Sequence, residues 1–518
     1  MADPPQLTLA LSPGDALDGP ALAGAVGLSC VPEGSEPFSK SYLDTFDGRV
    51  FRSGRVLILH ENVQPAALEW HSVDGSNGER APVKRPPRCA DDLPSAAVAL
   101  RKAVGVRALG DVLAVRGERH AFRMLDSLEK TVARLTAVTG RVYHAKGEAE
   151  APTLIRVVPF KGFEWAGESI EQALLDAMPG ARTAASEFEV LAGALHIDPR
   201  GYEASVALDL EPSMPGGAAA AKLFGATYET MLATLPGARA AIDSEFLHDF
   251  RVAVRRSRAW LSRLKDVLDV ELLQHMKQEL GWLAAVTGPV RDLDVYLLLV
   301  DGYRAELPEQ DAAALGVFEQ YIRRQRRTAQ RRLVRALDTD RFSALMRRWP
   351  NWLKNMERAS VAPAREPVID VASRALAKQC KRVSCRGRAI TPSSAPGALH
   401  ELRIECKKLH YLLEAFGSLY EAGGTARLTR GLKRLQDNLG DLHDFEVQSN
   451  ALRDFANQIA AKGGGAADTQ VAMGRLVERL GARQQAERIR FAETWSRFES
   501  KRNRAFMKSA FAQLPKRH

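Results

Sequence analysis

The chain has 518 residues, of which 45% are hydrophobic, and 73 Lys and Arg outweigh 63 Asp and Glu to give a net charge of +10. This length allows about two to four domains. No apolar run approaches the roughly 20 residues that a membrane-spanning helix needs, and the first residues lack the pattern of a signal peptide. The five cysteines form no CxxC pair, so we expect reduced thiols and no zinc site. These features predict a soluble, cytoplasmic protein.

Charge is distributed unevenly along the chain. Residues 1–215 contain 22 basic and 29 acidic residues, a net charge of −7, whereas the remainder contains 51 basic and 34 acidic residues, a net charge of +17. A partner with negative charge is therefore expected at the C-terminal part.

The first part of the chain has the alternation and turn composition of β structure. Gly and Pro cluster between the apolar runs, and a polar segment rich in Pro and Gly leads into the next region. The pattern predicts strands over residues 7–11, 50–60, 107–124 and 131–143, a loop or hairpin over 74–88, a short helix over 168–178 and a linker near 199–217.

From about residue 218 to the end, the apolar spacing is helical almost throughout. A break with two prolines at 361–367 divides this region, and arginine-rich helices are expected at 321–337 and 477–498. The arginines at 323, 324, 326, 327, 331 and 332 are too dense for one helix face, so some must face solvent. These helices could also serve a partner protein.

Two copies of one motif lie 152 positions apart in the helical region. Segment 247–261 aligns with segment 399–413, and a second motif aligns at the same offset, which indicates a duplicated helical unit. The paired residues are His248 with His400, Arg251 with Arg403, Arg255 with Lys407, Arg256 with Lys408, Arg258 with His410, Gly288 with Gly440, Arg291 with His443, Asp292 with Asp444 and Asp294 with Glu446.

The position of these basic residues on each helix suggests that they line a boundary such as a groove or a pore. At about 100° per residue, apolar residues form one stripe in each copy, and the basic residues and histidines lie along its edge. The stripes are Leu247, Phe250, Val254 and Leu261, and Leu399, Leu402, Cys406 and Leu413. Only Arg256 and Lys408 are expected to point to the opposite, solvent face. Alternatively, the edge residues extend from the core margin and pair with Asp249 or Glu401.

Other residues in the repeat admit a structural or a binding role. The histidines could donate hydrogen bonds to phosphate in a protonation-dependent way, or could simply bond a carboxylate or a carbonyl. Lys222 and Arg374 match at the same offset and are candidates from the first helix of each copy. Asp292 and Asp444 follow expected glycine turns, where they would cap or pair rather than catalyse. No nucleophile has a base partner, and no histidine has metal-ligand spacing.

Four motifs in order resemble the CHAD domain, the conserved-histidine α-helical domain. They are EFLHDFRVAVRRSRAWL, GPVRDLDVY, LHELRIECKKLHYLLEAF and LGDLHDFEV. The resemblance implies two pseudo-twofold-related four-helix bundles over residues 217–518, with copies at 217–360 and 369–515, and a basic cavity that binds inorganic polyphosphate. One departure is His410, where the family usually has arginine. The implied binding residues are Lys222, His248, Arg251, Arg255, Arg258, Arg291, Arg374, His400, Arg403, Lys407, His410 and His443.

Residues 1–200, before a linker at 201–216, resemble the CYTH domain, an antiparallel β tunnel that hydrolyses triphosphate with a divalent metal. The best match is SYLDTFDGRVFRSGRVLIL. The family's Glu-x-Glu-x-Lys strand is missing, and metal-assisted hydrolysis needs such carboxylates. The substituted positions are Gln6, Thr8 and Ala10 for that strand, Ile58 and His60 for two arginines, Asp74 for a lysine, and Arg156 and Val158 for late carboxylates. We therefore expect a degenerate tunnel, kept for folding, ligand capture or a partner surface.

The expected fold is thus α+β and multidomain, a β tunnel followed by an all-α domain. The expected function is polyphosphate binding without enzyme activity, cofactor or metal, at polyphosphate granules and with granule proteins as possible partners. Nucleic-acid binding is a second hypothesis, although only Trp260 and Tyr411 could stack bases near the motifs. Residual triphosphatase or polyphosphatase activity is a third.

Overall fold

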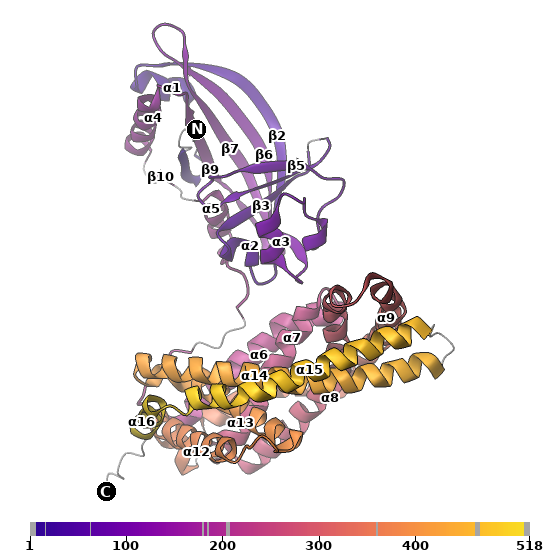
Figure 1. The fold of residues 1–518 in the computed structure, drawn as a ribbon. Coiled ribbons are helices and arrows are strands. Elements are labelled where there is room, and N and C mark those ends of the chain that lie inside the picture. The colour runs from indigo at the N-terminus through magenta and orange to yellow at the C-terminus, as the bar shows by residue number, and fades with distance from the viewer. Residues whose placement is uncertain are drawn as a thin grey trace. The chain divides into compact units, whose positions relative to one another are not determined.

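The computed structural model describes residues 7–15, 17–62, 64–178, 181–183, 186–203, 208–358, 361–461 and 467–511. The chain forms two compact units, residues 1–203 and residues 204–518. The first unit is rich in strands and the second is helical (Figure 1). Gln6, expected in the first strand motif, lies outside the described residues.

The N-terminal unit is built on one antiparallel sheet with the strand order β10-β1-β9-β7-β6-β2-β3-β4-β5, and β8 pairs with β7. The strands are β1 Leu7–Pro13, β2 Ser29–Thr45, β3 Arg55–His60, β4 Ala67–Ser72, β5 Glu79–Pro82, β6 Leu109–Leu125, β7 Thr131–His144, β8 Gly147–Glu150, β9 Pro152–Pro159 and β10 Arg182–Thr183. The helices are α1 Gly19–Ala25, α2 Arg49–Arg52, η1 Ala90–Asp92, α3 Val98–Val104, α4 Glu164–Ala177 and α5 Glu187–Ala194.

Most of the predicted strands are confirmed, but the predicted strand over 50–60 is wrong in its first part. There the chain forms the short helix α2, and strand β3 begins only at Arg55. The buried carboxylate of Asp44 accepts hydrogen bonds from the backbone N–H groups of Val50 at 2.8 Å and Phe51 at 2.9 Å. This cap satisfies the free N–H groups of the helix start and outweighs the strand propensity of the apolar residues.

Alternate side chains of the sheet enter different cores. Leu9 of β1 packs in one core with Ile170 of α4. Tyr42 of β2 packs in another with Phe188 of α5, their rings stacked at 5.1 Å between centroids. Because side chains of a strand alternate between faces, Phe38 and Lys40 share the face of Tyr42, and both line a cavity beside this second core.

The helical unit contains α6 Gly216–Ala240, α7 Ser244–Arg263, η2 Lys265–Val267, α8 Val270–Ala305, α9 Glu309–Leu337, α10 Asp340–Glu357, α11 Ala362–Arg365, α12 Val368–Arg388, α13 Pro396–Phe416, η3 Gly417–Leu419, α14 Ala422–Ala461, α15 Ala467–Phe498 and α16 Lys501–Ala510. A side chain caps the helix that carries the first motif, α7, whereas α13 begins without a side-chain cap. The Asp243 carboxylate accepts from the backbone N–H of Glu245 at 2.8 Å at the start of α7.

Successive helices pack in the same order in both predicted copies, α6 to α9 and α12 to α15, and α7 also contacts α13. The expected apolar stripes are confirmed, because their residues are buried in one core that includes both copies. A smaller core joins α8 and α9 to α14 and α15 through residues such as Phe318 and Leu452. A β domain followed by a helical region is thus confirmed, while the pseudo-twofold relation stays a prediction. No described helix combines the length and apolar character that a bilayer crossing needs.

Candidate functional site

A row of arginines on α7 forms one side of the first candidate site. Arg251, Arg255 and Arg258 follow at helical spacing, and Arg291 comes from the neighbouring helix α8. Arg251 is anchored to α8 by a hydrogen bond from Nη1 to the hydroxyl oxygen of Thr287 at 2.9 Å. Burial lowers the pKa of Arg251, and the positive charges of the other three arginines lower it further. The other three guanidinium groups therefore lie within electrostatic reach of Arg251.

The second copy places its basic residues at the same site. Arg255 of α7 donates from Nε to the Tyr411 hydroxyl of α13 at 2.6 Å. The pKa of Lys407 is lowered to about 8, first by burial and then by the charges of Arg403 and Arg255. Arg403 donates from Nη2 to the Asp444 carboxylate at 3.1 Å. Cations from both copies thus repel one another across the contact between α7 and α13.

We refer to the six converging cations as the shared cluster: Arg251, Arg255, Arg258, Arg291, Arg403 and Lys407. Carboxylates near them include Glu245, 3.7 Å from Arg291, and Asp292, which lies near Arg251. Arg255 and Arg258 are exposed, and the other four are half-buried. Besides burial, the charges of Arg403 and Arg255 lower the pKa of Lys407, and the charge of Asp444 offsets them only in part.

Two of the predicted histidines lie together beside the shared cluster. The Nδ1 atoms of His400 and His443 are 3.2 Å apart, and both rings line a cavity of about 120 Å³ with Arg488. Burial, followed by the charge of Arg403, lowers the pKa of His443. A single proton between two such rings is compatible with this geometry, but two protonated rings would repel. His248 is half-buried on α7.

Within the described residues, the three remaining candidates form no hydrogen bond or ion pair with the shared cluster. Lys222 is exposed on α6, and Arg374 pairs with Glu366 at a different cavity. His410 lies near Glu414, and burial lowers its pKa. Its buried Nδ1 has no hydrogen-bond partner in the described part of the chain. We therefore restrict the candidate site to the shared cluster and the adjacent histidines.

The expected solvent orientation is wrong for Arg256, whereas Lys408 is partly exposed and lines a cavity. Arg256 is only 9% exposed, and its Nε donates to the Glu414 carboxylate of α13 at 3.1 Å. Lys408 donates to Glu405 at 2.8 Å. The contact between α7 and α13 covers the face that Arg256 would present to water on an isolated helix, so Arg256 pairs across this contact.

The expected glycine turns before Asp292 and Asp444 are also wrong. Gly288 lies inside α8 and Gly440 inside α14, and both helices continue through the motif. Helix packing outweighs the local preference of glycine for turns. Neither aspartate can therefore cap a helix start, but the expected pairing with a basic residue is confirmed for Asp444 by its bond with Arg403.

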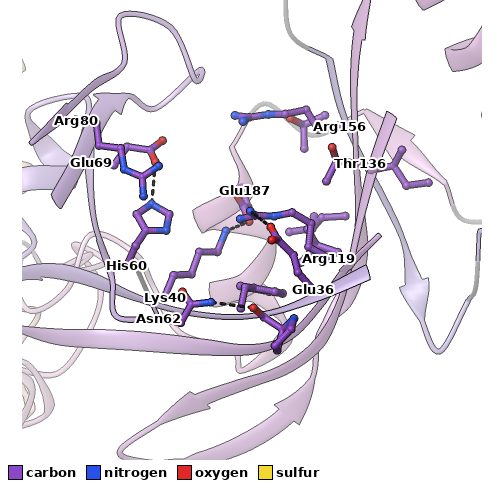
Figure 2. A pocket seen from close by; sticks show the side chains of 16 residues that line it. Glu36, Lys40, His60, Asn62, Glu69, Arg80, Arg119, Thr136, Arg156 and Glu187 are labelled. Atoms are coloured by element: carbon purple, nitrogen blue, oxygen red, sulfur yellow. Dashed lines mark hydrogen bonds and ion pairs between the residues drawn. The ribbon is translucent and has the colours of Figure 1, made fainter. Parts of the chain in front are cut away.

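A second candidate site is a cavity of about 660 Å³ in the N-terminal unit. Residues from β1 to β7, from β9 and from α5 line it, so the sheet curves around the cavity. Figure 2 shows that its labelled side chains are mainly charged or polar and come from opposite walls. The charged and titratable lining residues are Glu36, Lys40, His60, Glu69, Arg80, Arg119, Arg156 and Glu187.

Each carboxylate of this cavity is paired with a basic group, as the dashed lines in Figure 2 mark. Glu187 pairs with Lys40, Glu69 with His60 at 2.8 Å, and Glu36 with Arg119 at 2.9 Å. The hydrogen bond from His60 is the largest contribution that lowers the pKa of Glu69, to about 2. For Glu187, burial alone would raise the pKa, but the charge of Lys40 reverses the shift.

The substituted family positions do not restore a metal site. Thr8 and Arg156 lie opposite each other on β1 and β9 and line the cavity, whereas Ala10 and Ile58 are buried in a core. An arginine thus stands where the resemblance implies a carboxylate ligand. No group of three potential ligands gathers within the described residues. A divalent cation does not fit a cavity whose carboxylates already bind cationic side chains.

Three cavity cations were missed by the sequence reasoning: Lys40, Arg80 and Arg119. Lys40 could have been found from parity, because Phe38, Lys40 and Tyr42 share one strand face, and the ammonium group lies 5.7 Å and 5.3 Å from the two ring centroids. The first part of strand β2 was not predicted, since Pro32, Gly34 and Pro37 disguise it. Arg80 and Arg119 carry no comparable local signal.

Residues 222–453 match the family model of the CHAD domain. The helical unit carries a CHAD domain. Two uncharacterized proteins of Mycobacterium tuberculosis, MT2285 and Rv2226, are each 28% identical over 215 residues, which is 40% of this chain and 39% of each relative. The matched segment therefore spans well under half the length of those relatives.

Two solved structures are also similar. The CHAD domain from the plant Ricinus communis is 21% identical, with a TM-score of 0.46 over 61% of this chain and 97% of that chain. PptA from Streptomyces chartreusis is 18% identical, with a TM-score of 0.44 over 54% of this chain and 99% of that chain.

Proposed function

We propose that the CHAD domain of this chain binds inorganic polyphosphate at the shared cluster. The observation that carries the proposal is the convergence of Arg255 with Arg403 and Lys407, cations of two copies that repel one another without a ligand. A polyanion would remove this repulsion. CHAD domains are associated with polyphosphate, which agrees with this chemistry.

The composition of the shared cluster suits a flexible phosphate polymer. Arginine presents a planar fork to phosphate oxygens, while lysine acts as a mobile point charge. Binding also releases counterions from the polymer, as it does from nucleic acids. Polyphosphate has no bases, so recognition needs no stacking surface.

Nucleic-acid binding is less well supported, because the two nearby aromatic residues are engaged. Trp260 is fully buried and donates to the carbonyl oxygen of Tyr411 at 3.0 Å. The Tyr411 hydroxyl accepts from Arg255, and its side chain is buried. Neither ring is available to stack on a base.

The proposal is tested by titrating the full chain with long-chain polyphosphate, single-stranded DNA and duplex DNA at about 0.15 M salt, where weak contacts are screened. The variant Arg255→Gln with Arg258→Gln removes two exposed cations of the cluster. We expect polyphosphate affinity to fall at least about tenfold, since charge-assisted contacts contribute about 1.5 kcal/mol or more each.

The matched control is Arg347→Gln with Arg348→Gln, two exposed arginines of α10 outside the cluster. It loses the same charge and should bind normally. Equal losses of polyphosphate affinity in both variants would show that binding depends only on general surface charge. Equal affinity of the wild-type chain for polyphosphate and both DNAs would show the same.

We further propose that the N-terminal unit does not hydrolyse phosphate chains, because its cavity carboxylates are paired with cations rather than free for metal. Phosphate release from triphosphate and polyphosphate should stay at background with magnesium or manganese. Release that depends on the metal and is lost in Glu69→Gln would contradict this proposal.

Association with polyphosphate granules in the cytoplasm is the cellular counterpart of the proposed binding. A fluorescent fusion of the full chain should localise to granules, and the Arg255→Gln with Arg258→Gln variant should disperse. Granule localisation of this variant at the wild-type level would indicate recruitment by a partner protein instead.

A further inference from the structure

A separate basic cavity of about 770 Å³ lies in the helical unit, outside the shared cluster. The end of α7 and η2 line it from the first copy, and α12 and α13 line it from the second. Asp266 is the acidic residue among its described lining. The basic residues are Arg263, Lys265, Arg374, Lys378, Lys381, Arg382 and Lys408.

Carboxylates compensate only part of this charge. Glu405 accepts from Arg263 at 2.9 Å and from Lys408 at 2.8 Å, and Glu366 pairs with Arg374. Within the described part of the chain, the four remaining cations have no ion pair. They are Lys265, Lys378, Lys381 and Arg382, and all four are exposed.

The cavity also contains a buried donor that lacks an acceptor. The Arg263 side chain is 7% exposed, and its Nε has no hydrogen-bond partner among the described residues. Gln379 holds Glu405 in place by donating to its carboxylate at 2.9 Å, which fixes the position of Arg263. Burial lowers the pKa of Arg263, and the charge of Arg382 lowers it further. A buried guanidinium N–H without an acceptor is costly, and the positive charge of Arg263 adds to the field that an anion in the cavity would meet.

Most of the basic residues of this cavity are not repeated in the other copy of the duplicated unit. At the offset that pairs His248 with His400, most of its cations have neutral or acidic counterparts. These counterparts are Ala415 for Arg263, Gly417 for Lys265, Ala226 for Lys378, Glu229 for Lys381 and Thr230 for Arg382. The shared cluster, by contrast, has basic residues or histidine at both positions of each pair. The cavity is therefore a feature of one side of the duplicated unit.

No aromatic side chain is among the described residues that line the cavity, and these residues offer no stacking surface for a nucleotide base. We propose that this cavity is a second, independent site for a compact inorganic oligophosphate of about three phosphates. Such an ion carries about as many charges as the four uncompensated cations can neutralise. The assignment does not require polyphosphate to bind at the shared cluster.

The test is calorimetric titration of the full chain with tripolyphosphate and, separately, with ATP. The cavity variant Lys378→Gln with Lys381→Gln removes two exposed cations of α12. We expect its tripolyphosphate affinity to fall at least about tenfold, because two charge-assisted contacts are lost. The Arg347→Gln with Arg348→Gln control should keep wild-type affinity, and circular dichroism checks that all variants are folded.

A third variant separates this site from the proposed polyphosphate site. Arg255→Gln with Arg258→Gln should leave tripolyphosphate binding at the cavity within about twofold, since it removes none of the lining cations. The inference is overturned if the wild-type chain shows no saturable tripolyphosphate binding, or if the cavity variant binds normally. It is also overturned if only the shared-cluster variant loses binding, or if ATP binds more tightly than tripolyphosphate.

Discussion

Basic side chains converge in both the shared cluster and the N-terminal cavity, but the two sites differ in how far carboxylates balance the positive charge. In the cavity, Lys40, His60 and Arg119 each pair with a glutamate. In the shared cluster, burial lowers the pKa of Lys407 to about 8, and the positive charges of Arg403 and Arg255 contribute to the shift. The number of basic residues is therefore a poor guide to anion binding. The charge that remains after internal pairing is the useful quantity.

The largest effect is expected from removing one partner of the buried ion pair in the N-terminal cavity, Lys40 and Glu187. Glu187→Gln leaves the Lys40 ammonium, whose side chain is 9% exposed, without its carboxylate. We expect the N-terminal unit to lose about 3 kcal/mol of unfolding free energy, because an unpaired buried charge keeps its desolvation cost. Hydrogen exchange in denaturant measures this unit separately from the helical unit.

The control for this variant is Glu148→Gln, which removes an exposed pair with Arg141 and should cost less than about 1 kcal/mol. If Glu187→Gln lowers the unfolding free energy no more than Glu148→Gln does, the ion pair with Glu187 is not what stabilises the buried Lys40 ammonium. The contrast with the shared cluster would then lose its energetic basis.

A smaller effect, the uptake of protons on binding, would sharpen the comparison at the shared cluster. Polyphosphate should raise the depressed pKa of Lys407, because nearby negative charge favours the ammonium form. Binding at pH 8 should then take up about half a proton, and affinity should fall as the pH rises above 8, since the free lysine must be protonated to bind.

Calorimetry in buffers of different ionisation enthalpy measures this uptake. Lys407→Arg keeps the charge at all relevant pH values and should remove the uptake while preserving binding. An uptake that persists unchanged in this variant would show that another group, such as His443, accounts for it.

The sequence predicted features that repeat along the chain better than features that arise from contacts between distant elements. The apolar stripes and basic edges of α7 and α13 followed from periodicity, and both stripes are buried in one core. The burial of Arg256 could not be predicted in this way, because its partner Glu414 belongs to the other copy. Likewise, α2 depends on capping by Asp44, which a strand-like run of apolar residues hides.

The candidate site was predictable to a similar extent. Six of the proposed residues converge in the shared cluster, whereas Arg374 and His410 lie apart from it. A common offset identifies equivalent positions in two copies, but it does not show which of them face one another. The packing of α7 against α13 decides that, and it depends on apolar contacts far apart in the sequence.

The central claim is that both copies form one polyphosphate site, and single substitutions in each copy test it most directly. Polyphosphate of one fixed length is titrated calorimetrically into the wild-type chain, Arg258→Gln of the first copy and Lys407→Gln of the second. The account predicts that each substitution weakens all of the binding at unchanged stoichiometry. Retention of a fraction of sites at wild-type affinity in either variant would mean that the copies bind independently, which would contradict the account.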